Sequence, residues 1–143
     1  MIAVDTNILV YAHREDTPQH GAARDALRSL AETGRSWGVP WPCVHEFTAI
    51  VTHRRIFAPP SSIEDALQAI SDLLELPGVT TLGEGPDHLQ RLALLLRQSG
   101  VVGPKVHDAR IVAICATHGV RELWTADRDF SYFRELATRN PLV

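Results

Sequence analysis

The sequence predicts a single α/β domain over residues 1–143, with a parallel β-sheet of about four to five strands and helices on both faces. Three observations predict this fold. The chain has 143 residues, of which 45% are hydrophobic, so it can build one domain around one core. Short apolar segments alternate with longer stretches in which apolar residues recur at helical spacing. Alternating strands and helices are typical of a parallel sheet covered on both faces.

Four segments have the length and apolar character of buried strands: residues 1–5, 37–41, 79–82 and 121–125. The first segment is apolar up to its last residue, Asp5. The second contains Pro40, which a strand tolerates at its end. From Asp127 onward, we expect a loop that leads into the aromatic segment 130–133.

Helical spacing of apolar residues predicts five helices, at residues 19–32, 43–54, 63–76, 87–99 and 108–118, and a short helical turn at 8–10. Thr17–Pro18 is a start signal for the first of these helices. Leu67 in the third helix and Leu89 in the fourth are expected to face the core. Leu94 and Leu95 widen the apolar stripe of the fourth helix, which fits either a subunit contact or a helix covered on all sides.

Composition and charge limit the class of protein. No apolar run of about 18 residues occurs, and the N-terminus has no basic start. We therefore expect no membrane span, no signal peptide and a cytoplasmic location. Cys43 and Cys115 lie far apart and are expected to be core thiols. Because 14 basic residues stand against 17 acidic ones, binding of nucleic acid would depend on local basic patches.

Five acids lie where the predicted strands and helices meet. Asp5 ends the first strand, and Glu46 lies in the first turn of the helix after the second strand. Asp108 opens the helix before the fourth strand, and Asp127 directly follows that strand, with Asp129 behind it. Right-handed crossovers bring such element ends to one edge of the sheet, where ligands bind in α/β folds. We therefore expect carboxylates to converge at that edge.

Each acid alone also has a structural explanation. Helix starts favour acids such as Glu46 and Asp108, and turns favour acids such as Asp127. Asp5 is different, because an unpaired carboxylate at the end of a central strand is costly to bury. Converging carboxylates repel one another and need a cation. Oxygen ligands without clear His or Cys partners indicate Mg²⁺ or Mn²⁺, which suits hydrolysis of a phosphodiester by metal-activated water.

Three small polar residues, Thr6, Asn7 and Thr125, lie beside these acids. Their side chains are able to orient a carboxylate, a water or a phosphate by hydrogen bonds. They are equally suited to capping the turn after a strand. We favour the orienting role for Thr6, whereas both roles stay open for Asn7 and Thr125.

Four segments carry a resemblance to a known family: Val4–Asn7, His45–Phe47, His107–Ala109 and Thr125–Phe130. Over essentially its whole length, the chain resembles the PIN domain, and within that family the VapC-type toxin ribonucleases of bacterial toxin–antitoxin pairs. The opening Asp-Thr-Asn and the closing Thr-x-Asp-x-Asp-Phe are the specific parts of this resemblance. The other two segments match mainly by order and spacing.

The resemblance implies Mg²⁺- or Mn²⁺-dependent endonucleolytic cleavage of structured RNA, such as transfer or ribosomal RNA, leaving a 5′-phosphate. Asp5, Glu46, Asp108 and Asp127 match the family's four catalytic acids, and Asp129 matches an accessory acid. We expect Asp5, Asp108, Asp127 and Asp129 to hold the metal. The resemblance also implies a homodimer and a cognate antitoxin that obstructs the site.

Four arginines are the expected contacts to RNA: Arg14, Arg54, Arg55 and Arg128. Arg54 and Arg55 belong to the basic run His53–Arg55, which has a solvated face as its alternative explanation. Arg128 lies between two candidate metal ligands and has an ion pair with one of them as its alternative.

Two other functions stay open. A non-catalytic interaction module of the same fold would be expected to lack one or more of the four acids. A haloacid-dehalogenase-like phosphatase would need a second aspartate at position 7, where the chain has Asn7. A nucleotide-binding Rossmann domain is excluded, because no G-x-G-x-x-G follows the first strand.

Overall fold

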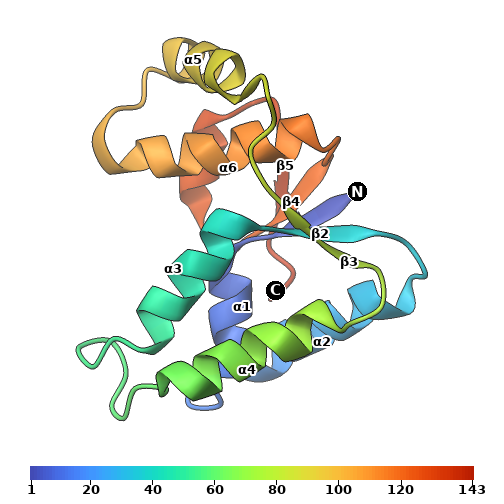
Figure 1. The fold of residues 1–143 in the computed structure, drawn as a ribbon, viewed down its shortest axis with the longest axis vertical. Helices are drawn as coiled ribbons and strands as arrows, with labels where there is room; N and C mark the ends of the chain where they lie inside the picture. The colour runs from blue at the N-terminus through green and yellow to red at the C-terminus, as the bar shows by residue number, and fades with distance from the viewer.

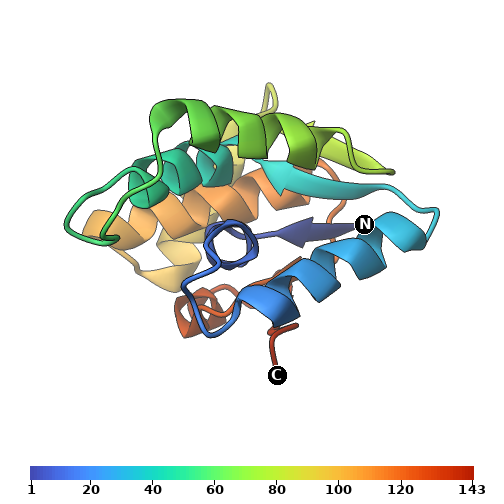
Figure 2. The ribbon, with the colours of Figure 1, turned by 90° about the horizontal axis from the view of Figure 1, so that it is seen from below.

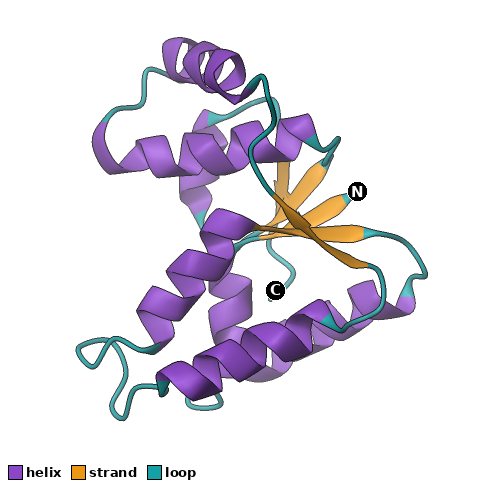
Figure 3. Ribbon diagram, in the orientation of Figure 1, coloured by secondary structure: helices purple, strands orange, loops and turns teal.

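A computed structural model describes all residues from Met1 to Val143. Its centre is a five-stranded sheet in the order β3-β2-β1-β4-β5, and every neighbouring pair is parallel. The strands are β1 (Ile2–Val4), β2 (Trp37–Pro40), β3 (Val79–Leu82), β4 (Glu122–Trp124) and β5 (Ala137–Arg139). The predicted parallel sheet is therefore confirmed, with β1 at its centre (Figure 3).

Six helices surround this sheet: α1 (Thr6–His13), α2 (His20–Glu32), α3 (Trp41–Val51), α4 (Ile63–Leu74), α5 (His88–Ser99) and α6 (Val106–Thr117). Figure 1 shows α5 and α6 on one side of the sheet and α2 and α4 on the other. Figure 2 shows β1 leading directly to α1, which is seen end-on, so the chain turns sharply between the two. Short 3₁₀ helices occur at Gly103–Lys105 and Arg128–Tyr132. The predicted coverage of both faces is confirmed.

The register of the central strands determines which residues meet at the carboxyl edge. Val4 is paired with Trp124, so β1 and β4 end at the same level. The next residues along the chain, Asp5 and Thr125, are consequently neighbours. Parallel strands have all their carboxyl ends on one side, and α1 and α3 begin there as well (Figure 1).

Several sequence predictions need correction. The predicted turn at 8–10 is part of the full helix α1, and α6 begins two residues before the predicted start at Asp108. Leu67 and Leu89 do not face the core, because they are 49% and 73% exposed. On α5, Leu95 is buried but Leu94 is 55% exposed, so this helix is not covered on all sides. The reason is that α5 packs chiefly against α6, away from the sheet (Figure 1).

The core otherwise follows the sequence pattern. Trp37, Ile114 and Phe130 are almost completely buried. Cys43 and Cys115 are free, buried thiols, as predicted, and burial raises the pKa of Cys115 to about 12. None of the helices combines the length and apolarity that a membrane crossing requires.

Candidate active site

Asp5 lies at the junction of β1 and α1 and caps the helix. Its Oδ1 accepts hydrogen bonds from the Thr6 backbone N–H at 2.8 Å and the Cys43 thiol at 3.5 Å. Its Oδ2 accepts one from the Thr125 hydroxyl at 2.7 Å. Burial raises the pKa of Asp5 above its ordinary value, and these three donors oppose the rise. The Asp5 carboxylate is therefore buried, and both of its oxygens accept hydrogen bonds.

Thr6 links this carboxylate to Glu46. The buried Thr6 hydroxyl donates to Glu46 Oε2 at 3.0 Å. The prediction that Glu46 lies in the first turn of its helix was wrong, because α3 already begins at Trp41. Glu46 thus lies beyond the first turn, where the helix dipole no longer accounts for an acid. The hydrogen bond from Thr6 instead ties Glu46 to the group of acids around Asp5.

Thr125 and Asn7 join the ends of β1 and β4. The Thr125 hydroxyl, which donates to Asp5, accepts from the Asp127 backbone N–H at 3.0 Å and from Asn7 Nδ2 at 3.3 Å. Asn7 Oδ1 accepts from the Ala126 backbone N–H at 3.1 Å. Both roles that the sequence left open therefore occur: Thr125 orients Asp5, and Asn7 holds the backbone after β4.

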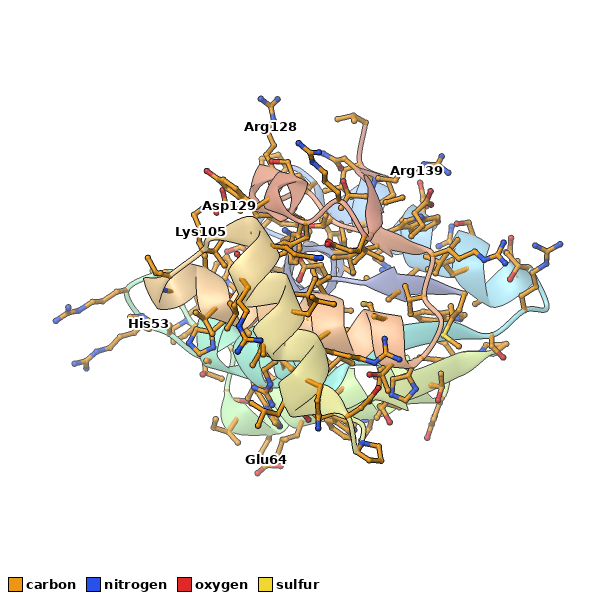
Figure 4. The ribbon with its side chains drawn as sticks, turned by 90° about the horizontal axis from the view of Figure 1, so that it is seen from above. His53, Glu64, Lys105, Arg128, Asp129 and Arg139 are labelled. Carbon is orange, nitrogen blue, oxygen red and sulfur yellow. The ribbon has the colours of Figure 1, made fainter.

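Asp127 and Asp129 lie at the start of the 3₁₀ helix after β4. Asp127 Oδ1 accepts from the Asp129 backbone N–H at 2.8 Å. The Asp129 carboxylate is 3.5 Å from Lys105 Nζ, which lies 4.1 Å from the centre of the Tyr132 ring. Lys105 and Asp129 are neighbours in Figure 4, whereas Arg128 extends outward. Arg128 forms no ion pair, so the alternative that it pairs with an adjacent acid was wrong.

Asp108, in the first turn of α6, differs from the other acids because its carboxylate has no hydrogen-bond or ion-pair partner. Its pKa is raised from 3.8 to about 6, mainly by burial. The negative charges of Asp127, Asp5, Asp129 and Glu46 contribute the smaller part of this rise, in that order of size. Asp108 lines the same cavity as Asp5, Glu46 and Asp127, and no cation of the protein pairs with its carboxylate.

Four of the five acids share one cavity of about 260 Å³, whereas Asp129 is not part of its lining. Its polar lining consists of Asp5, Thr6, Asn7, Glu46, Asp108 and Asp127. The predicted convergence of the four acids is therefore observed. No group of three or more His, Cys, Asp or Glu side chains is arranged to hold a metal ion by itself. Carboxylates spaced around a cavity still fit Mg²⁺ or Mn²⁺, because these ions prefer oxygen ligands and Mg²⁺ keeps several waters.

The predicted RNA-binding arginines fall into two groups. Arg54, Arg55 and Arg128 are exposed and form no ion pair. Arg14 has a side chain that is only 12% exposed and pairs with Asp16. The first group is available to phosphates, whereas Arg14 is already engaged within the protein.

Some residues of the site were missed in the sequence. Cys43 was interpreted only as a core thiol, yet it donates to Asp5. Lys105, the only lysine of the chain, was not predicted to belong to the site, although it is the cation that pairs with Asp129. An apolar wall that includes Ile56 and Phe57 lines the same cavity. Its signal was a pair of apolar residues directly after the basic run His53–Arg55.

Comparison with known proteins matches this chain to a family and to a relative of similar length. A family model described as the PIN domain matches residues 2–136. The chain is 37% identical to Ribonuclease VapC43 of Mycobacterium tuberculosis over 142 residues, covering 99% of this chain and 96% of that protein.

Solved structures show the same fold. Mycobacterium tuberculosis VapC20, described as a sarcin–ricin loop cleaving toxin, has a TM-score of 0.69 at 20% identity and covers 98% of this chain and 100% of that one. A toxin–antitoxin complex from Klebsiella pneumoniae has a TM-score of 0.62 at 17% identity and covers 99% and 98%.

Proposed function

This chain belongs to the PIN-domain family, and we propose that it is a metal-dependent endoribonuclease that acts as the toxin of a toxin–antitoxin pair. The observation that carries the proposal is the convergence of Asp5, Glu46, Asp108 and Asp127 on one cavity. The ribonuclease name of VapC43 supports RNA as the substrate. The description of VapC20 supports a structured target such as transfer or ribosomal RNA.

The proposed metal ligands are Asp5, Asp108 and Asp127, directly or through water, with Asp129 as an accessory ligand. When bound by these residues, Mg²⁺ or Mn²⁺ would supply a Lewis acid that lowers the pKa of water and offsets charge on the phosphate. Thr125 and Thr6 orient Asp5 and Glu46 through the bonds described above. The oxygen Oε1 of Glu46 has no partner and is free to take a proton from the attacking water. Water attacks phosphorus as it loses this proton, and the bond from phosphorus to the 3′-oxygen breaks. The 3′-oxygen leaves with the bonding pair and takes up a proton, so the products carry a 3′-hydroxyl and a 5′-phosphate.

The test is cleavage of a structured RNA pool by wild type and Asp5→Asn, each with Mg²⁺, Mn²⁺ or EDTA. Asparagine keeps the size of the side chain but removes the charge that binds metal. We expect the rate to fall at least about 100-fold, because a lost metal contribution is worth several kcal/mol of barrier. Asp25→Asn is the matched control, since Asp25 is exposed on α2 and does not line the cavity that holds the acids.

Three results are informative. Metal-dependent cleavage that Asp5→Asn loses and Asp25→Asn keeps supports the proposal. Equal, metal-independent cleavage by all three proteins identifies a contaminant and contradicts it. RNA binding without cleavage by wild type supports the alternative, a non-catalytic module, although a module would not need all four acids.

We also propose an antitoxin partner and a homodimer. The toxin–antitoxin description of the Klebsiella pneumoniae structure supports the partner. An apolar groove of about 590 Å³ lies between α1, α2, α3 and α4 and includes none of the four acids of the site. It offers a surface to which a segment of the antitoxin could bind. For the homodimer, the support is exposed apolar residues on and after α5, namely Leu89, Leu94 and Val102. Light scattering of the purified chain tests the dimer, and a monomer at all concentrations contradicts it.

A further inference from the structure

The cavity that holds the acids has a second wall, which is apolar: Val10, Tyr11, Ile50, Ile56 and Phe57. Ile56 and Phe57 belong to the α3–α4 loop, residues 52–62. Ile56 is 53% exposed although it lies beside carboxylates. Metal binding and water activation depend on oxygen atoms, so the proposed chemistry does not use this wall.

Hydrogen bonds within the α3–α4 loop fix its shape. The His53 carbonyl accepts from the Ile56 and Phe57 backbone N–H groups at 3.0 and 3.1 Å. The His53 ring Nδ1 accepts from the Arg55 backbone N–H at 3.1 Å. Figure 4 shows His53 at the same end of the molecule as Lys105 and Asp129. The loop is thus a defined turn that brings Ile56 and Phe57 to the cavity.

Arg14 anchors the other half of this loop to α1. Its guanidinium donates to the Pro59 carbonyl at 2.9 Å and the Ser61 hydroxyl at 3.3 Å, and it lies 4.3 Å from the centre of the Phe57 ring. Asp16 accepts from the same guanidinium at 2.9 and 2.6 Å. These contacts occupy the guanidinium and cover one side of Phe57. Arg14 is therefore poorly placed to bind a phosphate, contrary to the sequence prediction.

We propose that the α3–α4 loop binds the RNA base next to the scissile phosphate, with Ile56 and Phe57 packing against that base, and that Arg14 is a positioning residue for the loop. The inference rests on the proposed ribonuclease function and names the part of the substrate that this wall recognises. Unstacked bases are bound by apolar and aromatic side chains. The exposed Arg54 and Arg55 on the same loop are suited to the neighbouring phosphates.

The experiment compares wild type with Ile56→Ala and Phe57→Leu. Sequencing the ends that each protein produces in total RNA gives the base preference at the cut. Steady-state kinetics on an oligonucleotide with the preferred cut site gives KM and kcat. We expect KM to rise about 5- to 100-fold in each variant, the range for losing one stacked base, with kcat within about twofold. Base preference at one position beside the cut should weaken.

The matched control is Ile63→Ala, since Ile63 on α4 is 54% exposed and does not line this cavity. An unchanged KM and an unchanged base preference in Ile56→Ala and Phe57→Leu, while wild type cleaves, overturn the inference but leave the ribonuclease proposal intact. Absence of cleavage by wild type overturns both. Should Phe57→Leu unfold, the exposed Ile56→Ala still decides the question.

Arg14 has a separate readout. If Arg14 positions the loop, Arg14→Gln should raise KM as Phe57→Leu does, and the double variant should lose little more, because residues acting through one contact are not additive. The dependence of KM on salt should not change. A salt slope reduced by about 1, with additive losses, would instead show that Arg14 contacts a phosphate and would overturn its positioning role.

Discussion

Asp5 and Asp108 face the same cavity but have opposite surroundings. Both are carboxylates whose pKa is raised chiefly by burial. Asp5 has three hydrogen-bond donors, whereas Asp108 has none and is surrounded by other acids. On the Asp5 side of the site, the protein itself therefore supplies the hydrogen bonds that a buried carboxylate needs. The other side carries uncompensated negative charge, which a cation would neutralise.

The largest stability effect is expected at the Asp5 side, from Thr125→Val. Valine matches threonine in shape but removes the hydroxyl that donates to Asp5 and accepts from Asp127 and Asn7. A buried carboxylate would lose a donor, so unfolding free energy should fall by about 1–3 kcal/mol. Chemical denaturation in EDTA measures this. Thr125→Ser, which keeps the hydroxyl, is the control, and equal losses in both variants would contradict the assigned hydrogen bonds.

An opposite effect is expected at the other side, from Asp108→Asn. In EDTA at neutral pH, the variant should be more stable than wild type by about 1 kcal/mol, a value reduced from the full pKa shift because Asp108 is partly exposed. The raised pKa means that the folded protein binds the proton more tightly than the unfolded chain. The Asp108 contribution to stability is therefore present below pH 3.8 and lost as pH rises to about 6.

Denaturation over this pH range checks the sign of the Asp108 effect. The difference between Asp108→Asn and wild type should be near zero at the acid end and reach its full size above about pH 6. A variant that is less stable than wild type in EDTA at neutral pH would show that Asp108 is paired after all.

The smallest effect is expected from Lys105→Gln. Lys105 is the one cation that pairs with a site acid, Asp129, but this pair is largely exposed. Unfolding free energy in EDTA should therefore fall by roughly 0.2–1 kcal/mol. Added salt should shrink the difference, because ions screen exposed pairs. A difference that is independent of salt would indicate that packing of Lys105 on Tyr132 dominates.

The sequence predicts the parts of this molecule that depend on local pattern. Apolar segments and helical spacing predict the sheet and its two helical layers, and strand ends predict where Asp5 and Asp127 meet. The strand β5 was missed, because Ala137–Arg139 are all exposed and lack alternation. The full length of α1 was also missed, since the capping role of Asp5 depends on backbone geometry.

Contacts between distant residues are the other part that the sequence does not show. Thr6 and Glu46 are separated by 40 residues, and only the packing of α1 against α3 brings them together. Arg14 and Pro59 are separated by 45 residues, so Arg14 looked like a free cation in the sequence. Knowing which arginines are engaged therefore requires the fold.

The central claim is that the Asp108 side of the site is incomplete without a cation. Thermal unfolding of wild type, Asp108→Asn and Asp25→Asn, with increasing Mg²⁺ or Mn²⁺ after removal of metal, tests it most directly. A ligand that binds only the folded state stabilises it by about 2.7 kcal/mol at about 100 times Kd. We predict that Tm rises with metal in wild type and Asp25→Asn but rises much less in Asp108→Asn. A Tm that does not respond to either metal in wild type would contradict the account.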